Sequence, residues 1–173
     1  LKSYGTAVLS ELNGMYAFAL YNSTNNTLTL VRDPLSIKPL YYAVVESSVY
    51  FASEIKALLH ISGLIGECDL DVLATYLDYE NWDANHSLFN SVKVLEPGSS
   101  LTFQYEDGDL VSYQKFFKYK SNKPITHNTS EDLILESIER SVDQHLLSDV
   151  ELGTYLSGGL DSSLVATLAA KKS

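Results

Sequence analysis

Hydrophobic and polar positions between residues 15 and 52 follow the period of two that is typical of β-strands. The apolar segments Met15–Tyr21 and Thr27–Val31 flank a polar turn, and Leu40–Val45 and Val49–Ala52 repeat this arrangement. Strands placed so close in sequence leave no room for the crossover helices that parallel strands need. We therefore predict that these four segments form an antiparallel meander.

Helical spacing and turn signals mark the rest of the first part of the chain. The helices predicted there are Tyr4–Leu12, Ser53–Leu59 with Ser53 as its N-cap, and Asp71–Leu77. The irregular, polar segment Glu80–Ser100 is predicted to be a loop. Asp107-Gly108 between two apolar segments, Leu101–Tyr105 and Leu110–Tyr113, predicts a β-hairpin.

The composition changes after residue 113, where four lysines gather among polar residues and no apolar period continues. This change predicts a first domain over residues 1–113, a linker over 114–130 and a second domain over 131–173. Within the second domain, Ser130 is expected to cap a helix with apolar residues at helical spacing. A short buried strand, Leu152–Leu156, and a helix through Leu164–Ala170 should follow.

The composition is that of a soluble globular protein rather than a disordered one. Hydrophobic residues make up 45% of the 173 residues, and none of the apolar runs approaches the roughly 20 residues of a membrane helix. With 12 basic and 22 acidic residues the net charge is −10, so neither nucleic acid nor an anionic membrane is expected as a partner. Cys68 is the single cysteine, which rules out an intrachain disulfide and favours a cytoplasmic setting.

The segment Ser-Gly-Gly-Leu-Asp-Ser-Ser lies directly between the predicted strand and the last helix. Gly158 and Gly159 let a phosphate approach the backbone closely, while Ser157, Ser162 and the N-terminus of the helix supply donors and positive partial charge. Asp161 would repel a bare phosphate, so it indicates a magnesium ion that bridges a polyphosphate. The alternative interpretation is a plain strand-to-helix turn. We favour the phosphate-binding interpretation, because two glycines, the serines and an acidic residue occur together here. The segment is not a Walker loop, because no Gly-Lys-Ser/Thr follows.

This segment resembles the pyrophosphate-binding loop of the ATP-pyrophosphatase superfamily. Upstream, Gly14–Tyr21, Arg32-Asp33-Pro34 with Pro39–Tyr42, and Phe51–Leu58 resemble the later part of a class II glutamine amidotransferase domain. Joined by His145–Val150, the two parts together resemble the glutamine-hydrolysing asparagine synthetases. The resemblance is weakest over residues 67–128.

The resemblance implies both a fold and an activity. The fold is the C-terminal portion of a four-layer αββα N-terminal-nucleophile domain, of the α+β class, followed by the start of a parallel-sheet α/β ATP-pyrophosphatase domain. In this family, ammonia from glutamine reaches a second domain, where Mg-ATP adenylates the aspartate side chain and ammonia displaces AMP. The implied small-molecule partners are aspartate, glutamine and ATP, the cofactors ATP and Mg2+, and a homodimer of the full-length enzyme is a further expectation.

Site residues carry over only where the loop matches. Those expected at ATP or pyrophosphate are Leu156, Ser157, Gly158, Gly159, Asp161 and Ser162, with Asp161 also near magnesium. No catalytic residue carries over, because the family's nucleophilic cysteine is residue one of the mature enzyme and residue one here is Leu1. We therefore expect an inactive internal fragment of a longer enzyme.

Two positions depart from the family pattern, and three other assignments stay open. Ser36 stands where the pattern has glycine, which puts the local turn in question, and Asn13 stands where aspartate is frequent. A β-lactam synthetase, a polysaccharide-amidating enzyme and a non-catalytic nucleotide-binding remnant share the same features. Arg32 and Asp33 are expected to form a structural pair at a strand end rather than a functional one. The four histidines have no metal-ligand spacing.

Overall fold

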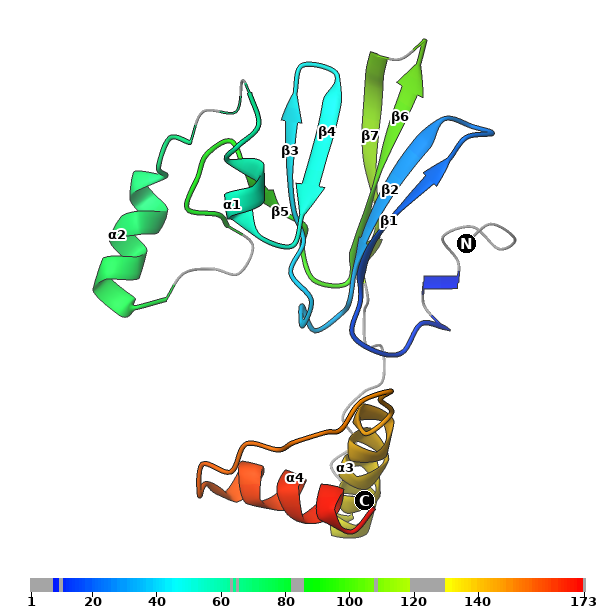
Figure 1. The fold of residues 1–173 in the computed structure, drawn as a ribbon, viewed down its shortest axis with the longest axis vertical. Helices are drawn as coiled ribbons and strands as arrows, with labels where there is room; N and C mark the ends of the chain where they lie inside the picture. Colours follow the sequence, from blue (N-terminus) through cyan, green and yellow to red (C-terminus); the bar gives the residue numbers. More distant parts are fainter. Residues whose placement is uncertain are drawn as a thin grey trace. The chain divides into compact units, whose positions relative to one another are not determined.

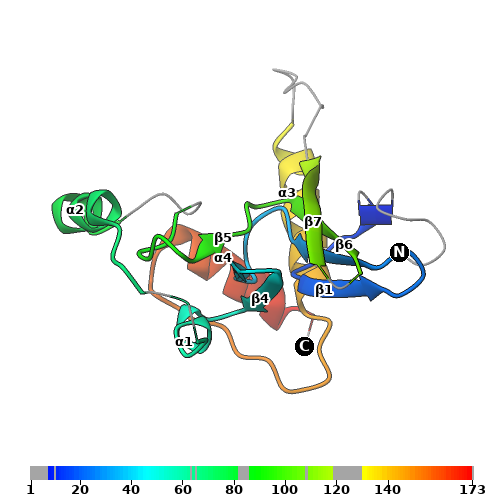
Figure 2. The same ribbon diagram turned by 90° about the horizontal axis from the view of Figure 1, so that it is seen from above.

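Two antiparallel sheets form most of the first of the two units into which the chain divides, residues 1–121 and 122–173 (Figure 1). The structure is a computed structural model. It describes residues 8–9, 11–62, 64, 66–81, 86–107, 109–118 and 130–172. Figure 2 shows β1, β6 and β7 grouped apart from β4 and β5, as their membership of two sheets requires.

The larger sheet has four strands in the order β1-β2-β6-β7. They are β1 (Ala17–Asn22), β2 (Thr27–Arg32), β6 (Ser99–Glu106) and β7 (Asp109–Lys118). β1 and β2 form the predicted hairpin, with Ala17 opposite Arg32 and Asn22 opposite Thr27. β6 and β7 form the second predicted hairpin, whose turn includes Asp107 at a φ of 51°. Gly108 lies outside the described residues.

The smaller sheet has the order β4-β3-β5. Its strands are β3 (Tyr41–Val45), β4 (Ser48–Ala52) and β5 (Lys93–Val94). The prediction of one meander from the first four strands is therefore wrong, because the two hairpins belong to different sheets. The reason is the connection over residues 33–40, which carries the chain from one sheet to the other, while β2 takes the distant β6 as its second neighbour.

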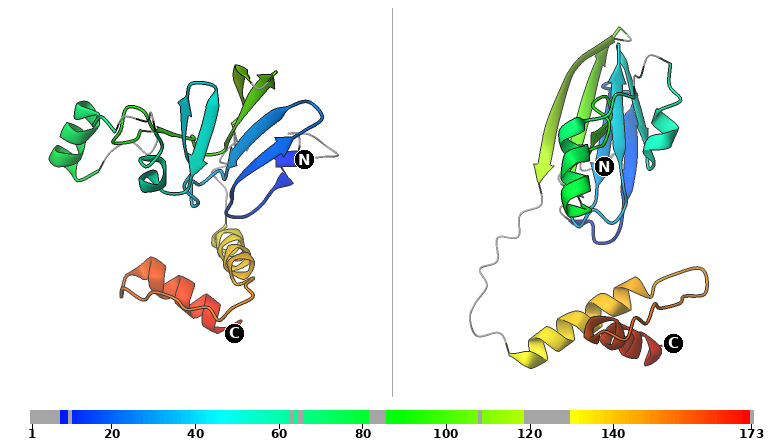
Figure 3. Two further views of the ribbon diagram at one scale, coloured as in Figure 1. Left: turned by 45° about the horizontal axis from the view of Figure 1, so that its top comes forward. Right: turned by 90° about the vertical axis from the view of Figure 1, so that its left-hand side faces the viewer.

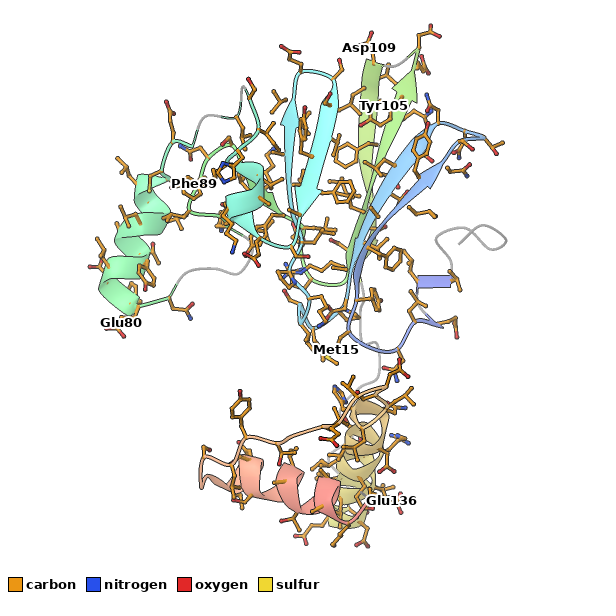
Figure 4. All side chains as sticks on the ribbon, viewed as in Figure 1. Met15, Glu80, Phe89, Tyr105, Asp109 and Glu136 are labelled. Atoms are coloured by element: carbon orange, nitrogen blue, oxygen red, sulfur yellow. The ribbon has the colours of Figure 1, made fainter. Side chains whose placement is uncertain are left out.

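The core of this unit contains leucines from β2, β6 and two connections, together with Phe103. Leu30, Leu40, Leu95, Leu101 and Phe103 are all buried and form one cluster. The rings of Tyr42 on β3 and Phe103 on β6 meet edge to face, with centroids 6.0 Å apart, so the contact joins the two sheets. Tyr105 packs against the same cluster from the far end of β6 (Figure 4).

Two helices accompany the sheets, α1 (Ile55–Leu58) and α2 (Leu70–Tyr79). Ser53 is not the N-cap of α1, which contradicts the prediction. The extended residue Glu54 takes that position, without a side-chain cap, and its carboxylate pairs with Lys56 at 2.6 Å. Asp69 caps α2 by accepting hydrogen bonds from the first-turn N–H groups of Asp71 and Val72.

The other predictions for this part have mixed outcomes. The segment predicted as a loop, residues 80–100, contains β5 and also Phe89, which forms an isolated bridge with Cys68. Both β5 and Phe89 pair with antiparallel partners that are distant in sequence. Of the helix predicted over Tyr4–Leu12, residues 4–7 and 10 lie outside the described residues, while Val8 and Leu9 form a 3-10 turn. β7 ends at Lys118, inside the predicted linker range of 114–130, and the domain boundaries remain a prediction.

The second unit contains α3 (Glu131–His145) and α4 (Leu160–Ala170), which pack against each other (Figure 3). Ser130 caps α3 as predicted, with its Oγ accepting from the Leu133 N–H at 3.4 Å. Val142 of α3 and Leu168 and Ala169 of α4 form a small buried cluster. None of the helices in the described part of the chain has the length and hydrophobicity of a membrane span.

The strand predicted over Leu152–Leu156 is absent from the structure, which corrects the sequence-based expectation. Residues 151–157 lie in an irregular segment between α3 and α4. A strand exists only where its backbone groups bond to a neighbour. The described residues of this unit contain no strand that could act as that neighbour. The segment therefore has the apolar pattern of a strand but forms no inter-strand hydrogen bonds within the described part of the chain.

Candidate functional site

The candidate site is the loop that leads into α4. Gly158 has a φ of 82°, in the left-handed region that favours glycine, and it turns the chain toward the helix. Gly159 follows as the N-cap of α4, with ordinary extended angles of −76° and 163°. The two neighbouring glycines therefore have different structural roles. Gly158 makes the turn, and Gly159 begins the helix.

The hydroxyl groups of Ser157 and Ser162 lie next to each other in this loop. Their Oγ atoms are 2.9 Å apart, although the residues are five positions apart in sequence. Ser162 also donates to the carbonyl of Gly159 at 3.1 Å, and the Gly159 N–H donates to Ser157 at 3.5 Å. The structure thus brings together the serines and the glycine that the sequence singled out.

The N-terminus of α4 has no side-chain cap. The helical hydrogen bonding begins with the N–H of Ser163, which donates to the carbonyl of Gly159 at 3.1 Å. The preceding N–H groups of the first turn point out of the helix, as at any helix start, and Gly159 adds no side chain to cover them. Backbone donors and the positive end of the helix dipole together suit an anion.

Asp161 lies in the first turn of α4 and is exposed. Its carboxylate is favourable beside the helix dipole and unfavourable beside an uncompensated phosphate. One exposed carboxylate beside an anion site matches the way magnesium is held, by one or two carboxylates plus phosphate oxygens. Leu156, expected to pack at the nucleotide, is 66% exposed just before the loop.

An apolar groove lies between α3, the segment before the loop and α4. One cavity of about 420 Å³ is lined by residues that include Leu146, Val150 and Ala166, and another of about 340 Å³ by residues that include Val142 and Val165. Neither cavity reaches residues 157–162. They therefore mark incomplete packing behind the loop rather than the anion site itself.

Arg32 and Asp33 form a second notable feature, which sequence reasoning described only as a structural pair. Their side chains do not bond to each other but to backbone groups, namely those of the loop over residues 34–39 and the carbonyl of Leu95. Arg32 donates to the carbonyl of Lys38 at 2.9 Å and to that of Leu95 at 2.8 Å. Asp33 is fully buried and accepts from the N–H groups of Leu35, Ile37 and Lys38 at 2.9–3.1 Å. The two side chains thus act through the backbone and not as the direct pair that was predicted.

The pKa values of these two groups follow from this arrangement. Burial raises the pKa of the Asp33 carboxyl, but the backbone N–H groups of Lys38, Ile37 and Leu35 stabilise its charged form and bring the pKa below the ordinary value. Burial also lowers the pKa of Arg32, against the opposing effects of Tyr41 and Asp33. A buried carboxylate with three backbone donors fixes the loop in one conformation.

Ser36, the position that departs from the family pattern, lies in this loop. Its φ is 61°, in the left-handed region where glycine is favoured. The local turn is thus the glycine-type turn, adopted by a serine. Arg32 donates to the carbonyl of Ser36, and Asp33 accepts from the N–H of Ile37, so both bonds hold the serine in this conformation.

The remaining candidate groups are scattered. Among the residues that the structure describes, no group of three or more His, Cys, Asp or Glu is placed to hold a metal ion. Cys68 is partly buried, with its Sγ 3.8 Å from the carbonyl of Asp69. His145 bonds through Nδ1 to the carbonyl of Ser141 at 2.8 Å, at the C-terminal end of α3.

Comparisons with known proteins match both units. The family profile of the glutamine amidotransferase domain matches residues 1–116, and that of asparagine synthase matches residues 133–173. Asparagine synthetase [glutamine-hydrolyzing] 1 of Bacillus subtilis is 38% identical over 97% of this chain and 26% of its own length. Asparagine synthetase B [glutamine-hydrolyzing] of Escherichia coli is 34% identical over 96% of the chain and 25% of its own length.

These similarities confirm the resemblance to glutamine-hydrolysing asparagine synthetases. A more distant relative, from Methanocaldococcus jannaschii, is 32% identical over 96% of the chain. The chain spans about a quarter of the length of the curated relatives that it matches. The observed mixture of helices with antiparallel sheets in the first unit is compatible with the matched domain. The chain belongs to the glutamine amidotransferase domain family, which it matches over residues 1–116.

Proposed function

We propose that this chain is part of an ATP-dependent, glutamine-hydrolysing asparagine synthetase and that its second unit holds the pyrophosphate part of ATP. The observation that carries the proposal is the loop before α4, where a glycine turn, two hydroxyls and an uncapped helix N-terminus meet. The match of residues 133–173 to asparagine synthase supports it. The net charge of −10 is no obstacle, because the anion is held by backbone groups.

Each loop residue has a role in this proposal. The first-turn N–H groups of α4 bind oxygens of the β- and γ-phosphates, and Ser157, beside Ser162, adds a hydroxyl donor. Asp161 would hold Mg2+ beside the phosphate oxygens. When bound, this ion neutralises charge that builds up on the leaving pyrophosphate. Leu156 contacts the nucleotide.

The reaction that the loop serves is formation of an aspartyl adenylate. The carboxylate of aspartate attacks the α-phosphate of ATP, pyrophosphate leaves, and ammonia from glutamine then displaces AMP to give asparagine. In this chain the loop acts on the leaving group, since an oriented set of donors favours charge on the departing oxygens. Aspartate, glutamine and ATP are the proposed small-molecule partners, with a homodimer of the full-length enzyme acting in the cytoplasm.

The proposal also covers the finer architecture. The two sheets of the first unit are the inner layers of the four-layer αββα domain, and the second unit is the start of a parallel-sheet ATP-pyrophosphatase domain. The helix-loop-helix order of the second unit supports this, because the loop lies between a segment with a strand pattern and a helix. In an open parallel sheet, ligands bind where strands end and helices begin.

Exchange of labelled pyrophosphate into ATP, measured with the full-length enzyme of which this chain is a part, tests the proposal. Adenylation is reversible, so exchange should require aspartate together with Mg2+ and should not occur with other amino acids. Exchange that depends instead on a different carboxylic acid would support one of the sister amidoligases. Absence of exchange with every acceptor would favour a nucleotide-binding remnant and overturn the proposal.

A further inference from the structure

The hydrogen bonds of the loop before α4 run in one direction. Ser162 has a single hydroxyl proton, which it donates to the carbonyl of Gly159 at 3.1 Å. Either hydroxyl could donate in the 2.9 Å contact between Ser157 and Ser162, and this bond and the bond to the Gly159 carbonyl form together only when Ser157 is the donor. The Gly159 N–H in turn donates to Ser157. The chain of bonds starts and ends on the backbone of Gly159.

This closed ring uses both hydroxyl protons inside the loop. Neither serine can donate to an incoming anion without giving up an internal bond, because each hydroxyl has one proton. Ser157 gives up its bond to Ser162 most easily, since Ser162 keeps its own bond to the Gly159 carbonyl. Ser162 is thus tied to the helix N-cap, while Ser157 is the hydroxyl free to turn outward.

We propose that Ser162 is a positioning residue that holds Ser157 and Gly159 in the anion-binding arrangement, and that Ser157 transfers its hydrogen bond from Ser162 to a pyrophosphate oxygen on binding. This inference rests on the proposed function. It assigns unequal roles to two serines that the sequence motif treats alike. The exchange replaces a bond between neutral hydroxyls by a stronger bond to a charged oxygen, so it favours the bound state.

A consequence is that the two serines act as one unit. Removing Ser157 takes away the donor, and removing Ser162 takes away the acceptor that orients this donor and the group that ties it to Gly159. The second removal should therefore cost little once the first has been made. Two serines that bound the anion independently would instead give effects that multiply.

Four variants of the intact protein test this with magnesium pyrophosphate as the probe, in calorimetric titrations: Ser157→Ala, Ser162→Ala, the double variant and Ser162→Thr. We expect each single alanine variant to weaken the binding of pyrophosphate roughly tenfold. The loss of affinity in the double variant should be at least threefold smaller than the product of the two single losses. Ser162→Thr should restore the affinity, because threonine keeps the hydroxyl. Ser163→Ala, one position further along α4, is the matched control and should bind like wild type.

The outcomes separate this inference from the proposed function. If wild type and the variants bind pyrophosphate and the two serine effects simply multiply, the coupled pair is wrong and the anion site stands. The coupled pair is also wrong if Ser162→Thr binds pyrophosphate as weakly as Ser162→Ala does. If wild type does not bind magnesium pyrophosphate at all, the proposed function fails, and this inference fails with it. Thermal unfolding of each variant establishes that the loss of binding is not a loss of fold.

Discussion

The fully buried carboxylate of Asp33 accepts a hydrogen bond from the backbone N–H of Lys38 at 2.9 Å. The carbonyl of the same Lys38 accepts from the guanidinium of Arg32, also at 2.9 Å. Two neighbouring side chains at the end of β2 therefore hold both polar groups of one residue in the next loop. This loop leads into the second sheet, so the pair fixes where the chain passes from one layer to the other.

Replacing Asp33 by asparagine should destabilise the first unit. One carboxylate oxygen accepts from Leu35 and Ile37 and the other from Lys38, whereas an asparagine places an NH2 group against one of these N–H donors. We expect the free energy of unfolding to fall by about 2–4 kcal/mol, the cost of unpaired buried donors. Chemical denaturation measures this change. The exposed Asp78→Asn is the control and should stay within about 0.5 kcal/mol of wild type.

The same carboxylate predicts a dependence of stability on pH. The pKa of Asp33 in the folded protein lies below its ordinary value of 3.8, so the folded state favours the charged form. Its contribution to stability is complete above the unfolded pKa and is lost as the pH falls through the folded pKa. The difference in unfolding free energy between wild type and Asp33→Asn should therefore narrow below about pH 4. A difference that stays constant from pH 6 downward would contradict this pKa direction.

Ser36→Gly should stabilise the protein. A φ of 61° strains the backbone of a serine but not that of a glycine. Asp33 and Arg32 hold the loop in this conformation whichever residue is present. We expect a gain of about 0.5–1 kcal/mol after the entropy of the more flexible unfolded chain is subtracted. Ser47→Gly, at a position without a positive φ, should be destabilising. Equal losses in both variants, measured by thermal unfolding, would be inconsistent with strain at Ser36.

The two glycines of the loop before α4 should respond differently to alanine. Gly158→Ala meets a φ of 82°, so it should destabilise this region by about 1–2 kcal/mol. Gly159→Ala has an ordinary φ, and its Cβ would lie 3.5 Å from Ser157 Oγ and 3.9 Å from Ser162 Oγ without a clash. It should unfold like wild type but bind magnesium pyrophosphate roughly tenfold more weakly, because the methyl group covers a donor surface. Identical behaviour of both variants in unfolding and binding experiments would argue against separate roles.

Local patterns in the sequence predicted the local features of the fold well. The period of two located the strands of both hairpins, and Ser130 and the apolar spacing located α3. The loop residues 156–162 were identified together, because their chemistry is contiguous in sequence. The serine at position 36 put the local turn in question, but the structure keeps the glycine-type turn there.

Partners distant in sequence could not be predicted in this way. β2 pairs with β6, placing Thr27 opposite Gln104, and no local signal encodes that choice. The segment 152–156 has the apolar pattern of a strand but no described neighbour, so pattern alone misled. The contact between the hydroxyls of Ser157 and Ser162 depends on how the turn folds back, which no local sequence pattern encodes.

Titration of the intact protein with pyrophosphate, with and without Mg2+, tests the central claim most directly. The account predicts binding that requires Mg2+ and that weakens roughly tenfold or more in Asp161→Asn, since a lost charged ligand is worth at least about 1.4 kcal/mol. Asp149→Asn, an exposed acidic residue outside the loop, is the control and should bind like wild type. Binding that is independent of Mg2+, or equal in Asp161→Asn and Asp149→Asn, would contradict the account.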